Sequence, residues 1–264
     1  LDDERLGPIG FDAPADLVAI SCDTYSARRT YQIAAEYRRR GVPVVVGGCH
    51  PTLMPDEALR FADAVVAGDA EDTWPAVVED ARHGRLQRLY RSRLPDLAGL
   101  RFDRSIFAGK RYGPMRLVQA GRGCGHDCDF CSVRALYGRR TRFRPPEEVA
   151  AEVEALAPSA VFFTDDNLFA RPSVAIDLLR RLRPLGVRWS CQATLDAADD
   201  ESLLQLMADS GCLSVVVGLE PLRDASLLQM HKPRRQSSAG YASRIAKLNR
   251  KGIMVYGSFV FEIG

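Results

Sequence analysis

Three observations lead the sequence to predict an α/β protein with two regions of parallel sheet. Short apolar, β-branched runs alternate with helix-like segments, an order that is typical of parallel strands joined by helical crossovers. The chain has 264 residues, enough for two moderate domains, and 46% of them are hydrophobic. Polar residues gather directly after several apolar runs, where ligands bind in parallel α/β proteins.

The first region, residues 1–90, has the pattern of a small doubly wound sheet. Its longest helix is expected to stop before Gly41, a residue type that readily takes the left-handed conformation at a helix end. Gly47 and Gly48 close the second apolar run. The expected strands are Leu17–Ser21, Val42–Val46 and Ala64–Val66, and the expected helices are Ala27–Arg40, Pro55–Phe61 and Thr73–Arg82.

Residues 91–114 are expected to form a linker, because they carry prolines and glycines and show no sustained period. The alternation resumes in residues 115–264, where we expect five strands. A helix opening at Pro146 has acidic residues in its first turn, where the helix dipole favours negative charge. The expected strands are Arg116–Ala120, Ala160–Thr164, Val187–Ala193, Leu213–Gly218 and Ile253–Phe261, and the later helices are Ser173–Arg183, Asp200–Ser210 and Ser238–Lys251.

Composition and charge disfavour several classes of protein. The formal net charge is only +2, which gives no indication of a nucleic acid or an anionic membrane as partner. No apolar stretch approaches the roughly 18 residues of a membrane span, and no secretory signal opens the chain. Seven cysteines without a disulfide pattern fit a reducing cytoplasm. We interpret the arginine clusters 38–40 and 139–144 as solvated faces, and Cys191 and Cys212 as buried small hydrophobes.

Three cysteines, Cys124, Cys128 and Cys131, fall within eight residues and supply three thiolates to one small site. Thiolates select iron–sulfur clusters or zinc over harder metals. A closed zinc site and a fully ligated four-iron cluster each need four ligands, so a metal position is left open for a group other than protein. A zinc site completed by His126 is an alternative, but that residue is only two positions from Cys124.

Polar residues also follow the later strands of the second region. Because the carboxyl ends of parallel strands meet at one edge of the sheet, these residues are expected to converge with the cysteines. Each of them taken singly has the ordinary explanation of a helix cap or turn residue. Together with the cysteines they predict a cofactor pocket; they are Asp165, Asp166 and Asn167, then Gln192 and Thr194, then Glu220.

The run Gly-Arg-Gly-Cys-Gly-His-Asp-Cys-Asp-Phe-Cys (121–131) resembles the signature of radical S-adenosylmethionine (SAM) enzymes, including the aromatic Phe130 before the last cysteine. Segments 162–167, 189–193 and 211–220 look like barrel strands of the subfamily with an N-terminal cobalamin-binding domain. Segments 47–58 and 68–72 are similar to that domain. The resemblance implies a Rossmann-like, cobalamin-binding-type parallel sheet followed by a partial (βα)6 TIM-like radical SAM barrel.

What the resemblance implies about chemistry is concrete. Cys124, Cys128 and Cys131 would hold three irons of a [4Fe–4S] cluster, and the fourth iron would chelate SAM. One electron from a donor such as flavodoxin or ferredoxin would cleave SAM to methionine and a 5′-deoxyadenosyl radical, which abstracts hydrogen from an unknown small-molecule substrate. Cobalamin-dependent methyl transfer is the other outcome left open.

The resemblance also implies roles for other residues. The Asp165, Asp166 and Asn167 loop would help to orient the methionine amine, and Gln192 and Glu220 would contact the ribose or methionine. Ser21, Gly47 and Gly48 would receive the nucleotide tail of cobalamin. The backbone of the fifth strand would meet the adenine.

Two departures from the subfamily leave alternatives open. The first strand and helix of the cobalamin-type domain are missing, and the histidine motif that ligates cobalt would precede Leu1. The chain also stops after the fifth barrel strand, so we expect a fragment truncated at both ends. A non-catalytic metal- or cobalamin-type binding module therefore remains an alternative, whereas an RNA-modifying enzyme is disfavoured by the lack of a basic excess.

Overall fold

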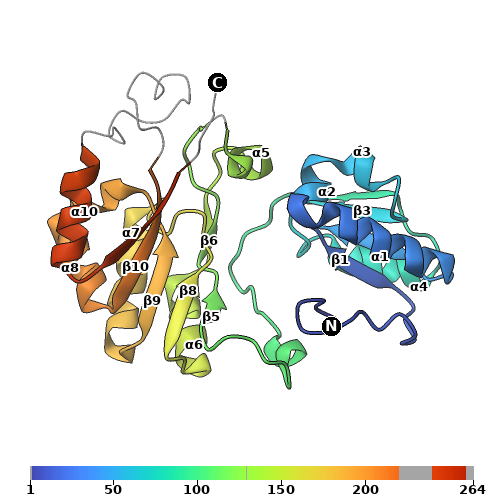
Figure 1. The fold of residues 1–264 in the computed structure, drawn as a ribbon, viewed down its shortest axis with the longest axis horizontal. Helices are drawn as coiled ribbons and strands as arrows, with labels where there is room; N and C mark the ends of the chain where they lie inside the picture. The colour runs from blue at the N-terminus through green and yellow to red at the C-terminus, as the bar shows by residue number, and fades with distance from the viewer. Residues whose placement is uncertain (1, 129, 220–239, 260–264) are drawn as a thin grey trace. The chain divides into compact units, whose positions relative to one another are not determined.

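The computed structural model describes residues 2–128, 130–219 and 240–259 (Figure 1). The chain divides into two compact units, each with its own sheet. The first comprises Leu1–Pro95 and Asp103–Arg111, and the second comprises Asp96–Phe102 and Tyr112–Gly264. The stretch expected to be a linker is thus shared between the two units. None of the helices in the described part of the chain is long and apolar enough to cross a bilayer.

The first unit contains a four-stranded parallel sheet in the order β1-β2-β3-β4. The three predicted strands are present, and a short fourth strand, which the sequence analysis did not anticipate, extends the sheet beside β3. Its Leu-Tyr-Arg sequence is too short to show a period. The strands are β1 (Val18–Ser21), β2 (Val44–Gly47), β3 (Ala64–Ala67) and β4 (Leu89–Arg91); the helices are α1 (Ala27–Arg39), α2 (Cys49–Leu53), α3 (Pro55–Ala58) and α4 (Trp74–Arg82).

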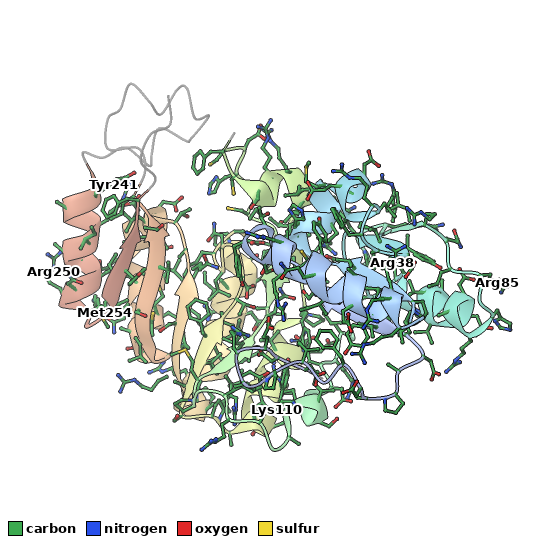
Figure 2. All side chains as sticks on the ribbon, turned by 45° about the vertical axis from the view of Figure 1, so that its right-hand side comes forward. Arg38, Arg85, Lys110, Tyr241, Arg250 and Met254 are labelled. Atoms are coloured by element: carbon green, nitrogen blue, oxygen red, sulfur yellow. The ribbon has the colours of Figure 1, made fainter. Side chains whose placement is uncertain are left out.

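Strands β2 and β3 form the centre of this unit. Their valines and alanines are buried, as expected for parallel strands that are covered on both faces. Helix α1 packs Ala27, Tyr31 and Ala34 against them and ends before Gly41, whose φ of 78° is the predicted left-handed stop. Arg38, labelled in Figure 2, and the two arginines that follow it are exposed, which confirms the solvated face predicted there.

The second unit is built on a five-stranded parallel sheet in the order β11-β10-β9-β8-β5, each strand connected to the next through a helix, which confirms the predicted partial barrel. A separate antiparallel pair, β6 and β7, was not predicted. The strands are β5 (Arg116–Val118), β6 (Gly121–Arg122), β7 (Arg142–Phe143), β8 (Ala160–Phe163), β9 (Arg188–Gln192), β10 (Cys212–Gly218) and β11 (Met254–Ser258); the helices are α5 (Ser132–Tyr137), α6 (Pro146–Leu156), α7 (Pro172–Leu182), α8 (Glu201–Asp209) and α10 (Tyr241–Arg250).

The core of the second unit lies between this sheet and its helices. Alternate strand residues are buried in it, among them Phe163 and Trp189, whose rings meet edge to face at 6.0 Å. The indole Nε1 of Trp189 donates to the Ser210 carbonyl at 3.0 Å, so this buried donor is satisfied. Cys191 and Cys212 are buried here, which confirms their interpretation as small hydrophobes.

The second arginine cluster is only partly a solvated face, which corrects the interpretation made from its composition. Arg144 is 4% exposed, and its guanidinium lies 2.6 Å from the Glu152 carboxylate. The same guanidinium lies over the Phe102 ring and donates to the Gln119 carbonyl at 3.0 Å. Arg142 is also buried and lies over the Tyr137 ring. Gln119 and Phe102 are far from Arg144 in the sequence, and none of these partners can be recognised from a run of arginines.

Candidate functional site

The cysteine loop begins between the two short strands β6 and β7. Gly121 lies opposite Phe143, and a Cβ at Gly121 would be 2.8 Å from the Arg142 carbonyl oxygen. Gly123 has a φ of +90°, and its Cβ would be 2.0 Å from the Arg140 carbonyl oxygen. Only glycine permits this close backbone approach in that conformation. The glycines before the first cysteine therefore fix where the loop enters the site.

The three cysteines are all free thiols, with Cys128 buried and Cys124 and Cys131 half-buried. Cys131 donates its backbone N–H to the Cys128 carbonyl at 3.1 Å and precedes helix α5. Burial raises the pKa of Cys124, and hydrogen bonds from the His126 backbone and the Asn167 side chain act in the opposite direction. Cys131 also interacts electrostatically with Cys124.

The segment after β8 contacts this loop directly. Asp165 Oδ2 accepts the Ala120 N–H at 3.0 Å, and Asp166 Oδ2 accepts the Gly123 N–H at 2.7 Å. The Asn167 side chain reaches Cys124 and also accepts the Phe169 N–H at 3.2 Å. The structure therefore brings these three residues to the cysteine loop, at the carboxyl end of β8.

Gln192 joins the same site from β9. Its side-chain Nε2 donates to the Asp165 backbone carbonyl at 3.3 Å. The backbone carbonyl of Gln192 accepts the Leu168 N–H at 3.1 Å. Thr194, two residues further on, instead bonds to the Asp196 carboxylate. Glu220 lies outside the described residues. The ends of β5, β8 and β9 thus meet around the start of the cysteine loop.

Burial changes the acidity of the carboxyl groups at this edge. Asp165 is 1% exposed, and burial raises its pKa to about 7 despite the hydrogen bonds from the backbone of Ala120 and Gly121. Its Oδ1 is a buried oxygen without a hydrogen-bond partner in the described part of the chain. Burial also raises the pKa of Asp166, against the effect of its bond from Gly123.

Two ion pairs that were not predicted from the sequence hold the middle of the cysteine loop. Asp127, between the first two cysteines, pairs with Arg134 Nε and Arg139 Nη2, both at 2.5 Å. An acidic residue within the motif followed by arginines seven and twelve positions later is the signal that could have revealed them. Phe130, next to the last cysteine, is 38% exposed.

The donor set can be compared with what a cluster needs. Within residues 2–128, 130–219 and 240–259, no three His, Cys, Asp or Glu side chains converge closely enough to hold a metal ion. The fit therefore rests on donor chemistry, since iron–sulfur clusters are bound by cysteine thiolates and one loop here carries three cysteines. Cysteine thiols lose their protons when they bind a metal as thiolates. The residues fit a cluster with one iron left for an outside ligand.

The first unit offers a different kind of edge. Ser21 and Gly47 are register partners at the carboxyl ends of β1 and β2. Gly48 follows with a φ of +108°, and its Cβ would be 2.8 Å from the Cys22 carbonyl oxygen. Nearby, Thr52 Oγ1 accepts the Gly68 N–H at 2.8 Å. The structure thus brings the three predicted residues together at the carboxyl ends of β1 and β2.

The first unit also contains a buried polar network that the sequence did not predict. His50 Nε2 lies 3.0 Å from Tyr31 Oη, which itself donates to Glu57 Oε1 at 3.1 Å. Burial and the bond to Glu57 raise the pKa of Tyr31 to about 12. The Tyr31 ring also stacks on Phe61 with centroids 4.2 Å apart. The histidine in Gly-Gly-Cys-His-Pro-Thr was the available signal.

Comparisons with known proteins match each of the two units to a family model. The B12 binding domain model matches residues 11–78, and the Radical SAM superfamily model matches residues 118–263. Two methyltransferases of Chlorobaculum tepidum are similar to the chain. The bacteriochlorophyllide d C-12(1)-methyltransferase is 30% identical, covering 98% of this chain and 60% of that protein. The bacteriochlorophyllide d C-8(2)-methyltransferase is 28% identical, covering 99% and 62%.

A solved structure shows the same fold. The radical SAM methyltransferase TsrM from Kitasatospora setae, with cobalamin and a [4Fe-4S] cluster bound, superposes with a TM-score of 0.79 at 20% sequence identity. The superposition covers 96% of this chain and 59% of that chain. The chain spans about three fifths of the length of the curated relatives named above. Because the superfamily model matches more than half of its residues, the chain belongs to the radical SAM superfamily.

Proposed function

We propose that this chain is the cofactor-binding part of a cobalamin-dependent radical SAM methyltransferase that acts on a small molecule. One observation carries the proposal: a B12 binding domain match precedes a radical SAM match in a single chain. Relatives that align over nearly the whole of this chain are named as methyltransferases. The separate edges of the two units support a distinct set of binding residues for each cofactor.

In the second unit, Cys124, Cys128 and Cys131 would hold the cluster through three thiolates. When bound, the cluster would supply the electron that cleaves SAM, and the three thiolates would leave one of its irons for an outside ligand. The chain itself buries Cys128 and the Asp165 side chain at this edge and leaves Cys124 and Cys131 half-buried. Gln192 is half-buried at the neighbouring strand end, which supports a contact with the methionine or ribose.

In the first unit, Ser21, Gly47 and Gly48 would receive the nucleotide tail of cobalamin, which would carry the methyl group. The place of the three residues supports this role, because ligands bind at the carboxyl ends of parallel strands, where Ser21 and Gly47 are register partners. The φ of +108° at Gly48, which favours glycine, shapes the loop at that edge. A Cβ at Gly48 would collide with the Cys22 backbone, so a larger residue at this position would force the loop to move.

The partners follow from this chemistry. A solved TsrM structure contains a tryptophan substrate, which supports a small organic molecule as the substrate class here. Each cleavage of SAM consumes an electron, so a reduced carrier such as flavodoxin or ferredoxin is required. Seven free cysteines support a reducing compartment, and we place the protein in the cytoplasm.

The proposal is tested by rebuilding the cofactors without oxygen. The chain is supplied with iron, sulfide, methylcobalamin, SAM and dithionite, and the nucleoside products are measured. We expect 5′-deoxyadenosine or S-adenosylhomocysteine to form, with bound cobalamin recovered after gel filtration. The Cys124→Ala variant should lose the iron and both products, whereas Cys49→Ala, an exposed thiol of the first unit, should retain them.

Three results would count against the proposal, the third of them against its cobalamin-dependent part alone. A protein that binds zinc stoichiometrically and takes up no iron would be a binding module rather than a radical enzyme. Product formation by Cys124→Ala at the rate of the unchanged chain would remove the cysteine loop from the chemistry. Iron and SAM cleavage without any cobalamin binding would retain the radical chemistry and exclude the methyl carrier.

A further inference from the structure

We propose that Asp165 and Asp166 are positioning residues that hold the cysteine loop for its cluster, and that their side chains do not bind the methionine group of SAM. The inference rests on the proposed function, because it concerns the same cluster site. It differs from the role that the sequence resemblance implies for this pair.

The contact of Asp166 is the more direct of the two. Its Oδ2 accepts the Gly123 N–H at 2.7 Å, and Gly123 is the residue immediately before Cys124. On its other side Gly123 lies against the Arg140 carbonyl so closely that a Cβ would be 2.0 Å away. The backbone before the first cysteine is therefore held between a carboxylate and the entry to β7. A bond from an anionic acceptor to a backbone N–H is stronger than a neutral one.

Asp165 fixes the same stretch three residues earlier. Its Oδ2 accepts the Ala120 N–H at 3.0 Å, and the Ala120 carbonyl accepts the Arg144 N–H at 2.8 Å. Both backbone groups of Ala120 are thus engaged from opposite sides. The Asp165 side chain is 1% exposed, so it lies within the protein rather than at a surface where a ligand could meet it.

Two further side chains, those of Asn167 and Gln192, contact the same loop and its supporting segment. The Asn167 side chain contacts Cys124, and Gln192 holds the Asp165 carbonyl from β9. All of these contacts converge on the loop and on each other. Residues that orient metal ligands in this way affect metal affinity although they do not touch the metal. The pair of aspartates accordingly belongs to the support of the cluster.

The test compares two variants of one residue with a matched control. Asp166→Ala removes the acceptor, whereas Asp166→Asn keeps an oxygen that can accept the Gly123 N–H. Asp177→Ala removes an exposed aspartate of α7 in the same unit, which pairs with Arg181. Hydrogen exchange at Ala120 and Gly123 is measured on the metal-free chain. Iron content, the EPR spectrum of the reduced cluster and SAM affinity are measured after anaerobic reconstitution.

We expect Asp166→Ala to exchange the Gly123 amide about tenfold faster and to bind iron about 10–100-fold more weakly. Asp166→Asn should stay within about threefold of the unchanged chain in both measurements, because its oxygen restores the bond. Asp177→Ala should resemble the unchanged chain. Thermal melting of the metal-free variants separates a local effect on the loop from a general loss of folding, since only the latter lowers the melting temperature strongly.

The inference is overturned if Asp166→Ala keeps the native exchange rate and iron content and loses only SAM affinity, or if Asn and Ala weaken SAM binding equally. Those results would assign the carboxylate to the ligand and leave the proposed function intact. If the unchanged chain takes up no iron, the proposed function fails, and exchange at Gly123 in the metal-free variants still decides whether Asp166 holds the loop.

Discussion

The two sheets of this protein have similar apolar strands but contrasting groups at their carboxyl ends. In the first unit the edge consists of Ser21, Gly47 and Gly48, and its close contacts are made by backbone. In the second unit the edge consists of thiols and buried carboxyl groups, led by Cys124 and Asp166. The first edge suits a large ligand that brings its own functional groups. The second suits a metal cluster, whose ligands the protein has to supply.

The same kind of parallel sheet can thus present either a glycine-containing edge or an edge of ionisable groups, depending on the loops that follow its strands. Glycine at a strand end gives space and positive φ, and it costs little where no side chain is needed. Ionisable groups at a strand end must be desolvated and held, so they need buried partners. We therefore expect the second unit to depend on buried charge and the first to depend on backbone space.

The largest expected effect concerns the buried pair of Arg144 and Glu152. Arg144→Met removes the guanidinium that lies 2.6 Å from the Glu152 carboxylate in the protein interior, and the free energy of unfolding of the second unit should fall by about 3–5 kcal/mol. Denaturant unfolding measures this when it is followed by the fluorescence of the buried Trp189, with Trp74 of the first unit replaced by Phe in every sample. The control is Arg181→Met, which removes an exposed pair and should change stability by less than about 1 kcal/mol. Equal effects of the two substitutions would contradict the dependence on buried charge.

A second prediction concerns pH and Asp165. Its pKa of about 7 exceeds its ordinary value of 3.8, so the folded chain binds more protons than the unfolded chain between these values. The contribution of this group to the stability of the metal-free protein should therefore be fully present below pH 4. It should be lost as the pH rises through 7, by on the order of 4 kcal/mol. Asp165→Asn should flatten this part of the profile. An unchanged slope in the variant would place the titrating group elsewhere.

A third prediction crosses the two edges with one substitution in each. Gly123→Ala should weaken iron binding about 10–100-fold and leave cobalamin binding unchanged, because its Cβ meets the Arg140 carbonyl. Gly48→Ala should do the reverse, because its Cβ meets Cys22. Gly138→Ala also has a positive φ but open space around it, and it controls for backbone strain alone. Loss of both cofactors in either variant would show that the edges are not independent.

The smallest expected effect lies in the network behind the first edge. Tyr31→Phe removes the hydroxyl that donates to Glu57 and lies beside His50, and it should cost about 1–2 kcal/mol of stability. Iron content should not change. Unfolding followed by far-UV circular dichroism, with iron analysis on the same sample, checks both expectations. A loss of iron here would break the separation between the two units.

The sequence predicted the strands with clear apolar runs, and the structure contains them with ends shifted by a few residues. It also placed Asp165 and Gln192 near the cysteines, because parallel strands share a carboxyl edge. It missed β6 and β7, since two-residue strands have no period. It also missed the burial of Arg144, because that depends on Glu152 and Phe102, which only the fold brings near.

If the three thiols hold a cluster with one iron free for SAM, the EPR spectrum of the reduced cluster should respond to SAM. The spectrum is recorded on the anaerobically reconstituted, dithionite-reduced chain before and after SAM is added, with iron counted on the same sample. We expect about four irons per chain and a spectrum that changes on adding SAM, with both lost in Cys124→Ala. A reduced cluster whose spectrum SAM leaves unchanged, or zinc in place of iron, would contradict this expectation.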